Sequence, residues 1–216
     1  MRCGVTTSEL DAENTERAVR ALLKDNNVEG AIELLRQARA AARSREDAAV
    51  ASDFGSWIAS LYLGEGRVVD ALREFEAAEA DEPSNVYHKL NTASQLLQAD
   101  RPADALRKLS AMVAILPENA SMRHGYHALR GEAEMRLGHT EEAIREFRRM
   151  SSPELVRAVI PVSLSLDLAA LLIREGVALE ECLQYLDLVK AKAESRNDAD
   201  LKQRVVRLEL LARRER

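Results

Sequence analysis

Residues 52–85 read SDFGSWIASLYLGEGRVVDALREFEAAEADEPSN, and this stretch decides the fold of the chain. Apolar residues recur at helical spacing on both sides of Gly64-Glu65-Gly66, which interrupts the pattern. Pro83 follows the second run and ends it, because proline cannot continue a helix. The stretch therefore predicts two short amphipathic helices that are joined by a tight turn.

The same skeleton returns one period later in the sequence. Ala59 is matched by Ala93, Ala71 by Ala105 and Pro83 by Pro117, a spacing of 34 residues. A fixed period of this length is typical of helical repeats, in which a single unit is too small to bury its own apolar face. Because stacked units share one core, we expect an all-α array of helix pairs.

The pattern resembles the tetratricopeptide repeat (TPR). That family places a small residue in helix A, an aromatic residue three positions later, glycine at the turn, alanine and an aromatic residue in helix B, and then proline. The residues at these places are Ala59, Tyr62, Gly66, Ala71, Phe75, Ala78 and Pro83. The resemblance implies a right-handed superhelical solenoid of antiparallel helix pairs, with these signature residues in its core.

About five repeats and a C-terminal capping helix then account for the chain. We expect a flexible N-terminus at 1–11, repeats at 12–45, 52–85, 86–119, 124–157 and 163–196, and a capping helix with a tail at 197–216. The sequence predicts further helices at 12–24, 28–42, 120–137, 180–194 and 199–213. Ser44 to Asp47 resembles a capping box, and Pro161 either kinks one long helix or separates two.

The predicted capping helix carries one narrow apolar stripe, and its other faces are charged. The stripe consists of Leu201, Val205, Leu208 and either Leu210 or Leu211. Such a helix is expected at the end of a repeat array, where it covers the exposed core of the last unit.

Charge and hydropathy argue against nucleic-acid binding and membrane insertion. The net charge is −5, acids and bases are interleaved, and only Arg213-Arg214-Glu215-Arg216 is locally basic. We interpret that end as a favourable helix-dipole interaction and a solvated tail. The longest weakly charged stretch, Val156 to Ile173, still contains Arg157, Pro161 and Asp167, so we expect no transmembrane helix.

The two cysteines, Cys3 and Cys182, do not suggest a disulfide framework, which favours a reducing compartment. The first residues, MRCGVTTSELDAEN, contain no apolar segment typical of a secretory signal, so we expect a cytoplasmic protein. One alternative stays open: a periplasmic or envelope-anchored protein whose leader was removed, with Cys3 as the lipidated residue. The alanine- and arginine-rich composition suggests a bacterial protein.

The resemblance also implies a binding surface, because TPR proteins line a concave groove with helix A residues outside the core. The partner-binding residues predicted on this basis are Asp53, Ser56, Trp57, Ser60, Leu63, Tyr87, Leu90, Asn91, Ser94, Leu97 and Gln98. Other units offer Glu13, Glu16, Arg17, Arg20, Ala128, Leu129, Glu132, Asp167 and Leu171. Trp57 and Tyr87 are of the types that anchor interfaces; the alternative is that they pack between adjacent helices.

Two further comparisons with the family refine this surface. Asn91 stands where many TPR domains place an asparagine that binds the backbone of a peptide ligand. Ser56 and Ser60 stand where co-chaperone domains place residues that hold a C-terminal carboxylate, and serine cannot supply the positive charge. The sequence therefore favours a mixed apolar and polar groove over a carboxylate clamp.

No residue pattern predicts catalysis. His124 and His127 could share one helix face and bind a metal, yet no third ligand is evident. Glu141-Glu142 and Glu180-Glu181 fall at predicted helix starts, where acids interact favourably with the helix dipole. Phosphate-binding loops and metalloprotease or hydrolase motifs are missing from the sequence. We expect no enzyme, cofactor or metal, with an all-helical enzyme or metal protein that uses His124 and His127 as an alternative.

We therefore predict a non-catalytic scaffold or adaptor that binds a partner peptide or protein in the groove. The alternative is a secretion-type chaperone or an envelope assembly factor of the TPR-lipoprotein kind. The apolar residues from Val156 to Val162 additionally suggest a contact for homo-oligomerisation.

Overall fold

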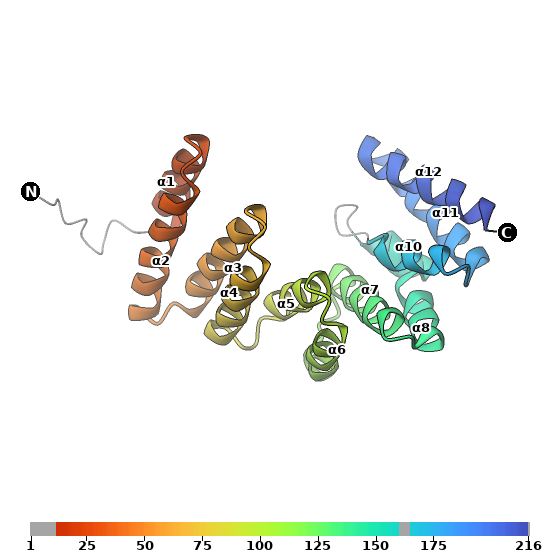
Figure 1. Cartoon of the computed structure of the whole chain (residues 1–216), viewed down its shortest axis with the longest axis horizontal. Helices are drawn as coiled ribbons and strands as arrows, with labels where there is room; N and C mark the ends of the chain where they lie inside the picture. Colours follow the sequence, from red (N-terminus) through yellow and green to blue (C-terminus); the bar gives the residue numbers. More distant parts are fainter. Residues whose placement is uncertain (1–11, 160–164, 216) are drawn as a thin grey trace, which may run out of the picture. The chain divides into compact units, whose positions relative to one another are not determined.

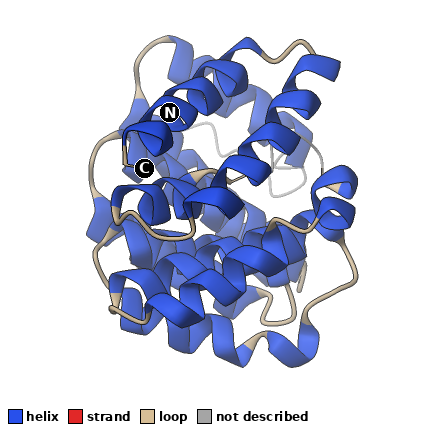
Figure 2. Cartoon of the chain, turned by 90° about the vertical axis from the view of Figure 1, so that its right-hand side faces the viewer, coloured by secondary structure: helices blue, strands red, loops and turns tan. Residues whose placement is uncertain are grey.

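The computed structural model describes residues 12–159 and 165–215, and over these ranges the chain folds into helices joined by turns and short loops (Figure 1, Figure 2). Their order is α1 (Ala12–Lys24), α2 (Val28–Ser44), α3 (Ala48–Gly64), α4 (Val68–Asp81), α5 (Val86–Gln98), α6 (Pro102–Ala111), η1 (Val113–Ile115), α7 (Ala120–Arg136), α8 (Thr140–Met150), α9 (Pro153–Ala158), α10 (Asp167–Arg174), α11 (Leu179–Ser195) and α12 (Ala199–Arg214). The prediction of an all-α chain is confirmed. Within the described ranges, no helix is both long and apolar enough to cross a bilayer.

The helix ends follow from local chemistry. The five helices predicted outside the second repeat, α1, α2, α7, α11 and α12, start within one residue of the expected positions. The capping box predicted at Ser44 to Asp47 is wrong in detail. Ser44 belongs to the last turn of α2, where its hydroxyl donates to the carbonyl of Ala40, while Asp47 alone caps α3 by accepting from the Val50 amide at 3.2 Å.

The turn between α3 and α4 shows why glycine suits the end of a helix. Gly66 has a φ of 71°, in the left-handed region that costs glycine nothing. In this conformation the chain reverses, and the amide of Arg67 donates to the carbonyl of Tyr62 at 2.8 Å. Gly138 repeats the device between α7 and α8, with a φ of 81°.

The chain divides after Gln95, within α5, into two compact units, and each has its own core. In the first unit, α1 packs on α2, α2 on α3 and α3 on α4. The predicted signature residues of the core are confirmed: Ala59, Ala71 and Ala78 are fully buried, and Tyr62 and Phe75 are at most 4% exposed. The alanines allow the helices to approach closely, and the aromatic rings fill the remaining space.

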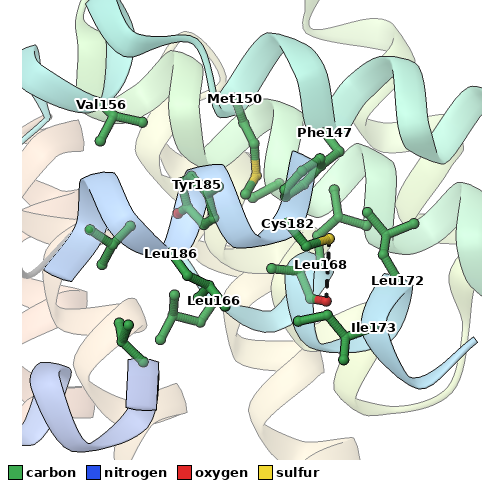
Figure 3. Close-up of a cluster of buried hydrophobic side chains, with 14 of the residues drawn as sticks. Phe147, Met150, Val156, Leu166, Leu168, Leu172, Ile173, Cys182, Tyr185 and Leu186 are labelled. Carbon is green, nitrogen blue, oxygen red and sulfur yellow. Dashed lines mark hydrogen bonds between the residues drawn. The ribbon is translucent and has the colours of Figure 1, made fainter. Parts of the chain in front are cut away.

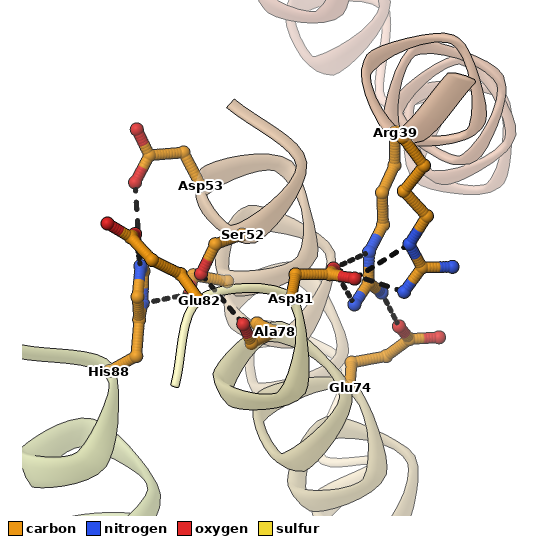
Figure 4. A network of polar contacts seen from close by, with 10 residues as sticks. Arg39, Ser52, Asp53, Glu74, Ala78, Asp81, Glu82 and His88 are labelled. Carbon is orange, nitrogen blue, oxygen red and sulfur yellow. Dashed lines mark hydrogen bonds and ion pairs between the residues drawn. The ribbon is translucent and has the colours of Figure 1, made fainter. Parts of the chain in front are cut away.

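An ion-pair network connects α2 to α4 in the first unit (Figure 4). The guanidinium of Arg39 on α2 is buried and donates to Asp81 at 2.6 and 2.8 Å and to Glu74 at 2.8 Å. Arg43, one turn further along α2, also donates to Asp81 at 2.8 and 3.0 Å. Burial alone would raise the pKa of Asp81, but the hydrogen bonds and charges of the two arginines outweigh it and lower that pKa.

The second unit has the larger apolar core, which α7 to α12 build together (Figure 3). Tyr185 of α11 stacks edge-on against Phe147 of α8, with ring centroids 5.5 Å apart. Cys182 is fully buried beside them, and its thiol lies 4.0 Å from the carbonyl of Ala169. Burial raises the pKa of this thiol to about 12, so it is not a reactive thiolate at neutral pH.

Two expectations from the sequence concern the Val156–Val162 stretch and the apolar stripe of α12 in this unit. The stretch from Val156 to Val162 was expected to offer an oligomer contact, but Val156 and Val159 are 1% exposed and belong to the core. Pro161 and Val162 lie outside the described residues, and so does Cys3. The sequence left open whether Leu210 or Leu211 belongs to the apolar stripe of α12. Leu211 is half-buried against the core and so belongs to the stripe, whereas Leu210 is 56% exposed.

A glycine pair on α7 offers a test of how tightly this unit is packed. A methyl group at Gly131 would overlap with the Leu168 side chain and lie 3.2 Å from Cβ of Glu146, whereas one at Gly125 would meet nothing within 4 Å. We expect Gly131→Ala to lower the free energy of unfolding by about 1–3 kcal/mol through overpacking. Gly125→Ala should raise it by up to about 1 kcal/mol, because alanine favours a helix.

Urea unfolding followed by circular dichroism measures both changes. The two substitutions are chemically identical and lie on one helix, so helix propensity acts equally on each. Equal effects at the two positions would contradict the close approach of α7 to its neighbours.

Candidate partner-binding surface on α3 and α5

The surface predicted from the sequence centres on α3 and on the part of α5 in the first unit. Asp53, Ser56, Trp57 and Ser60 follow one another at helical spacing and so share one side of α3. On α5, Tyr87, Asn91 and Ser94 have the same spacing. We call these seven residues the α3–α5 face.

Exposure separates the predicted residues into three groups. Asp53, Ser60, Tyr87 and Gln98 are exposed, while Ser56, Trp57, Leu63, Asn91 and Ser94 are half-buried. Leu90 and Leu97 differ from the prediction: they are 8% and 2% exposed, respectively, and belong to the interior rather than to an open groove. Gln98 falls in the second unit.

Trp57 and Tyr87 differ in whether they pack in the interior or face solvent. Trp57 is half-buried and packs against the core of the first unit, together with Leu63. Tyr87 is 56% exposed and is among the few large apolar side chains that face solvent. The ring of Tyr87 lies edge-on to His88, with centroids 6.0 Å apart, so it is supported on one side.

His88 connects the two helices and was not predicted as part of the site. Its side chain is 1% exposed, and Nδ1 lies 2.9 Å from the hydroxyl of Ser56 on α3 (Figure 4). On the other side of the ring, Nε2 lies 3.7 Å from Glu82 and 3.8 Å from Asp53, which is too far for a direct hydrogen bond. Nε2 is therefore a buried polar atom without a hydrogen-bond partner.

The surrounding charges decide which nitrogen of His88 carries the proton. Two carboxylates face Nε2, and they favour a hydrogen on that atom over a lone pair. The hydroxyl of Ser56 then donates to Nδ1, which acts as the acceptor. The ring thus directs an unused N–H donor toward Asp53 and Glu82.

The start of α5 holds this arrangement in place. The side-chain oxygen of Asn85 accepts from the amide of Tyr87 at 2.9 Å, which caps the helix. Its amide nitrogen donates to Glu82 at 2.8 Å and fixes that carboxylate near His88. The repeat period could have predicted that His88 is buried, because His88 falls 34 residues after the buried Phe54.

Asn91, one turn after His88, is the second polar group of interest. Within the described chain, its side-chain amide takes part in no hydrogen bond, although the residue is half-buried. An amide of this kind can donate and accept at once, which matches a peptide bond of a ligand. The α3–α5 face therefore combines aromatic surface with unused hydrogen-bonding groups.

The histidine pair that suggested a metal site has other partners. His124 is fully buried: its Nδ1 donates to the carbonyl of Met150 at 3.1 Å, and its Nε2 accepts from the amide of Ser165 at 3.1 Å. His127 is paired with Glu146 at 2.6 Å. Both nitrogens of His124 are thus occupied, and the described residues contain no group of three or more side chains suited to a metal.

Comparison with known proteins gives the fold a context. No family model and no curated protein sequence matches the chain. Among solved structures, it is similar to TTC0263, a thermophilic TPR protein of Thermus thermophilus, with 20% identity over 92% of this chain and 98% of that one and a TM-score of 0.60. A tetratricopeptide repeat protein of Parabacteroides merdae gives 16% identity, coverages of 94% and 76% and a TM-score of 0.59.

A third solved structure, YrrB, is described as a TPR protein with an unusual peptide-binding site. It gives 17% identity, coverages of 92% and 93% and a TM-score of 0.50. At these identities the similarities establish the fold, which is the one that the repeat pattern of residues 52–85 predicts.

Proposed function

We propose that this chain, which has the tetratricopeptide-repeat fold, is a non-catalytic scaffold that holds a peptide of a partner protein on the α3–α5 face. The observation that supports this most directly is the amide of Asn91, which is half-buried and forms no hydrogen bond within the described residues, on the same side of α5 as the exposed ring of Tyr87. A half-buried amide without a partner loses part of its hydrogen bonding to water, so a ligand that pairs with the Asn91 amide gains affinity. YrrB, a protein of the same fold, is described as peptide-binding.

The chemistry of the face restricts the partner. Tyr87 offers an exposed aromatic ring for an apolar side chain, and Asn91 pairs with the backbone. Asp53, with 76% of its side chain exposed, favours a basic residue nearby. The proposed ligand is therefore a neutral to basic peptide with at least one apolar side chain.

Affinity capture from native lysate tests this proposal with a matched pair of variants. The double variant Tyr87→Ala, Asn91→Ala removes one exposed ring and one unused amide, so both changes should spare the core. We expect at least a roughly tenfold loss of the captured partner, equivalent to about 1.4 kcal/mol of binding free energy. The control, Val69→Ser on α4, removes another apolar side chain, 74% exposed, from outside the face.

The control should retain the partner at the wild-type level. Thermal unfolding followed by circular dichroism verifies that all three proteins are folded. If the double variant captures the same proteins in the same amounts as wild type, the α3–α5 face is not the binding surface.

A further inference from the structure

A groove of about 530 Å³ lies between α10 and α12 in the second unit. On α12, the lining residues Arg204, Arg207, Leu211 and Arg214 recur at intervals of three or four and so form one stripe along the helix. From Arg204 to Arg214 the stripe extends roughly 15 Å, at 1.5 Å of rise per residue. The groove is therefore elongated along the helix.

The side of α10 completes the groove with the same periodicity. Asp167, Ala170 and Arg174 line it at intervals of three and four residues. Asp167 was one of the residues that the resemblance placed on a binding surface. With Arg174, four arginines and one aspartate line the groove. The groove is therefore positively charged, whereas the net charge of the whole chain is −5.

These four arginines differ from most others in the chain. Arginines elsewhere, such as Arg101 and Arg136, are paired with carboxylates. The four groove arginines are exposed, and none of them pairs with an acid of the described residues. The positive charge of the groove is thus not neutralised from within this part of the chain.

Apolar surface lies between the charges. Leu208 and Leu211 are half-buried in the groove, and Leu210 is 56% exposed on its rim. A helix that merely covers the end of a repeat array would present a polar outer face to solvent. An exposed leucine next to unpaired arginines departs from that expectation.

We propose that the α10–α12 groove binds an acidic, amphipathic segment of a partner protein. Carboxylates of the segment would pair with Arg204, Arg207 and Arg214 on one side and with Arg174 on the other. Its apolar side chains would cover Leu208, Leu210 and Leu211. The site lies on a different unit from the α3–α5 face. It favours an acidic ligand, whereas that face favours a neutral to basic one, so it goes beyond the function proposed above.

The shape and lining of the groove favour a peptide over other anionic ligands. A free phosphate or a single carboxylate would reach only part of a stripe of roughly 15 Å. A membrane surface requires apolar side chains that protrude, whereas two of these three leucines are recessed. Single-stranded nucleic acid usually stacks on aromatic side chains, and the described residues that line the groove include none.

Panning a random peptide display library against the whole chain tests the proposal. The variant Arg204→Glu, Arg207→Glu serves for counter-selection, since both side chains are exposed and their replacement should leave the fold intact. We expect selected peptides in which several acidic residues alternate with leucine-like ones. Fluorescein-labelled copies should bind the charge-reversed variant at least about tenfold more weakly, because attraction is replaced by repulsion.

Four controls make the result specific. Arg213→Glu on the same helix reverses one charge outside the groove and should alter affinity less than about twofold. Replacing glutamate by glutamine in the peptide should reproduce the loss, and Leu210→Ser should weaken binding several-fold. The Tyr87→Ala, Asn91→Ala variant should bind these peptides like wild type, which separates the two sites.

Three outcomes would overturn the proposal. The first is a selection that yields no peptide whose binding depends on Arg204 and Arg207. In the second, Arg213→Glu weakens binding as much as the double reversal does. The third is that phosphatidylserine vesicles or single-stranded DNA bind more tightly than the peptides and lose affinity in the double variant.

Discussion

Replacing Arg39 by alanine is expected to lower the free energy of unfolding by about 3 kcal/mol, one of the two largest effects predicted for this chain. Only 7% of the Arg39 side chain is exposed, and its partners Glu74 and Asp81 are 19% and 12% exposed. Removing one member of a buried ion pair typically costs about 3–5 kcal/mol, because the remaining charge stays buried without compensation. Arg43 continues to pair with Asp81, so the lower end of this range applies.

Arg43 provides the matched control. It donates to the same carboxylate from the next turn of α2, but 51% of its side chain is exposed. Exposed pairs contribute at most about 1 kcal/mol, so Arg43→Ala should have a small effect. Urea unfolding followed by circular dichroism compares the two variants, and equal losses would contradict the burial of Arg39.

The effect of Arg39 should also depend on pH. The arginines lower the pKa of Asp81 in the folded chain below its ordinary value of 3.8. The resulting stabilisation is therefore present above pH 3.8 and is lost as the pH falls through the lower pKa of the folded state. The difference between wild type and Arg39→Ala should accordingly shrink when unfolding is measured in more acidic buffers.

The helices and the core could be predicted from the sequence because they depend on local spacing. Ala59, Ala71 and Phe75 recur where any helix pair of this kind needs small and large residues. The burial of Arg39 could not be predicted in this way. Arg39 follows the buried Ala38 and lies one turn after the buried Leu35, yet its partners are 35 and 42 residues away in sequence. Its burial depends on the packing of α2 and α4 against α3, which brings Glu74 and Asp81 to Arg39.

The candidate surface was predicted less completely, for a related reason. The pattern identifies which residues of a helix A are outside its signature, but not how deeply each neighbouring helix covers them. Leu90 follows Ser56 by one period, yet it is buried where Ser56 is only half-buried. His88 was missed because its role comes from Asp53, Ser56 and Glu82, which approach it from outside α5.

Acidification from pH 6.5 to pH 4 is expected to remove about 3 kcal/mol of stability through His124 alone. Burial is the main cause that lowers the pKa of His124 from 6.5 to about 4, and the hydrogen bond to Met150 opposes it only in part. The unfolded chain thus takes up the proton near pH 6.5, whereas the folded chain resists it until about pH 4. Stability is fully present above pH 6.5 and is lost as the pH falls through this window.

The geometry explains why the folded chain excludes the proton. Nε2 of His124 accepts from the amide of Ser165, so a proton on this nitrogen would place two donors against each other. Tyr185, whose hydroxyl donates to the carbonyl of Ser165 at 2.6 Å, lies against the same nitrogen at 3.5 Å. Protonation must therefore break the contact that holds residue 165 to α7, or unfold the unit.

The variant His124→Gln tests this directly, since its amide can donate and accept but does not titrate. Urea unfolding of both proteins at a series of pH values should show wild type losing about 3 kcal/mol more than the variant between pH 6.5 and pH 4. His139→Gln is the control: 55% of the His139 side chain is exposed, and the loss that His124 causes should persist in this variant. If wild type and His124→Gln lose stability in parallel, His124 titrates like an exposed histidine and cannot be the buried acceptor of the Ser165 amide.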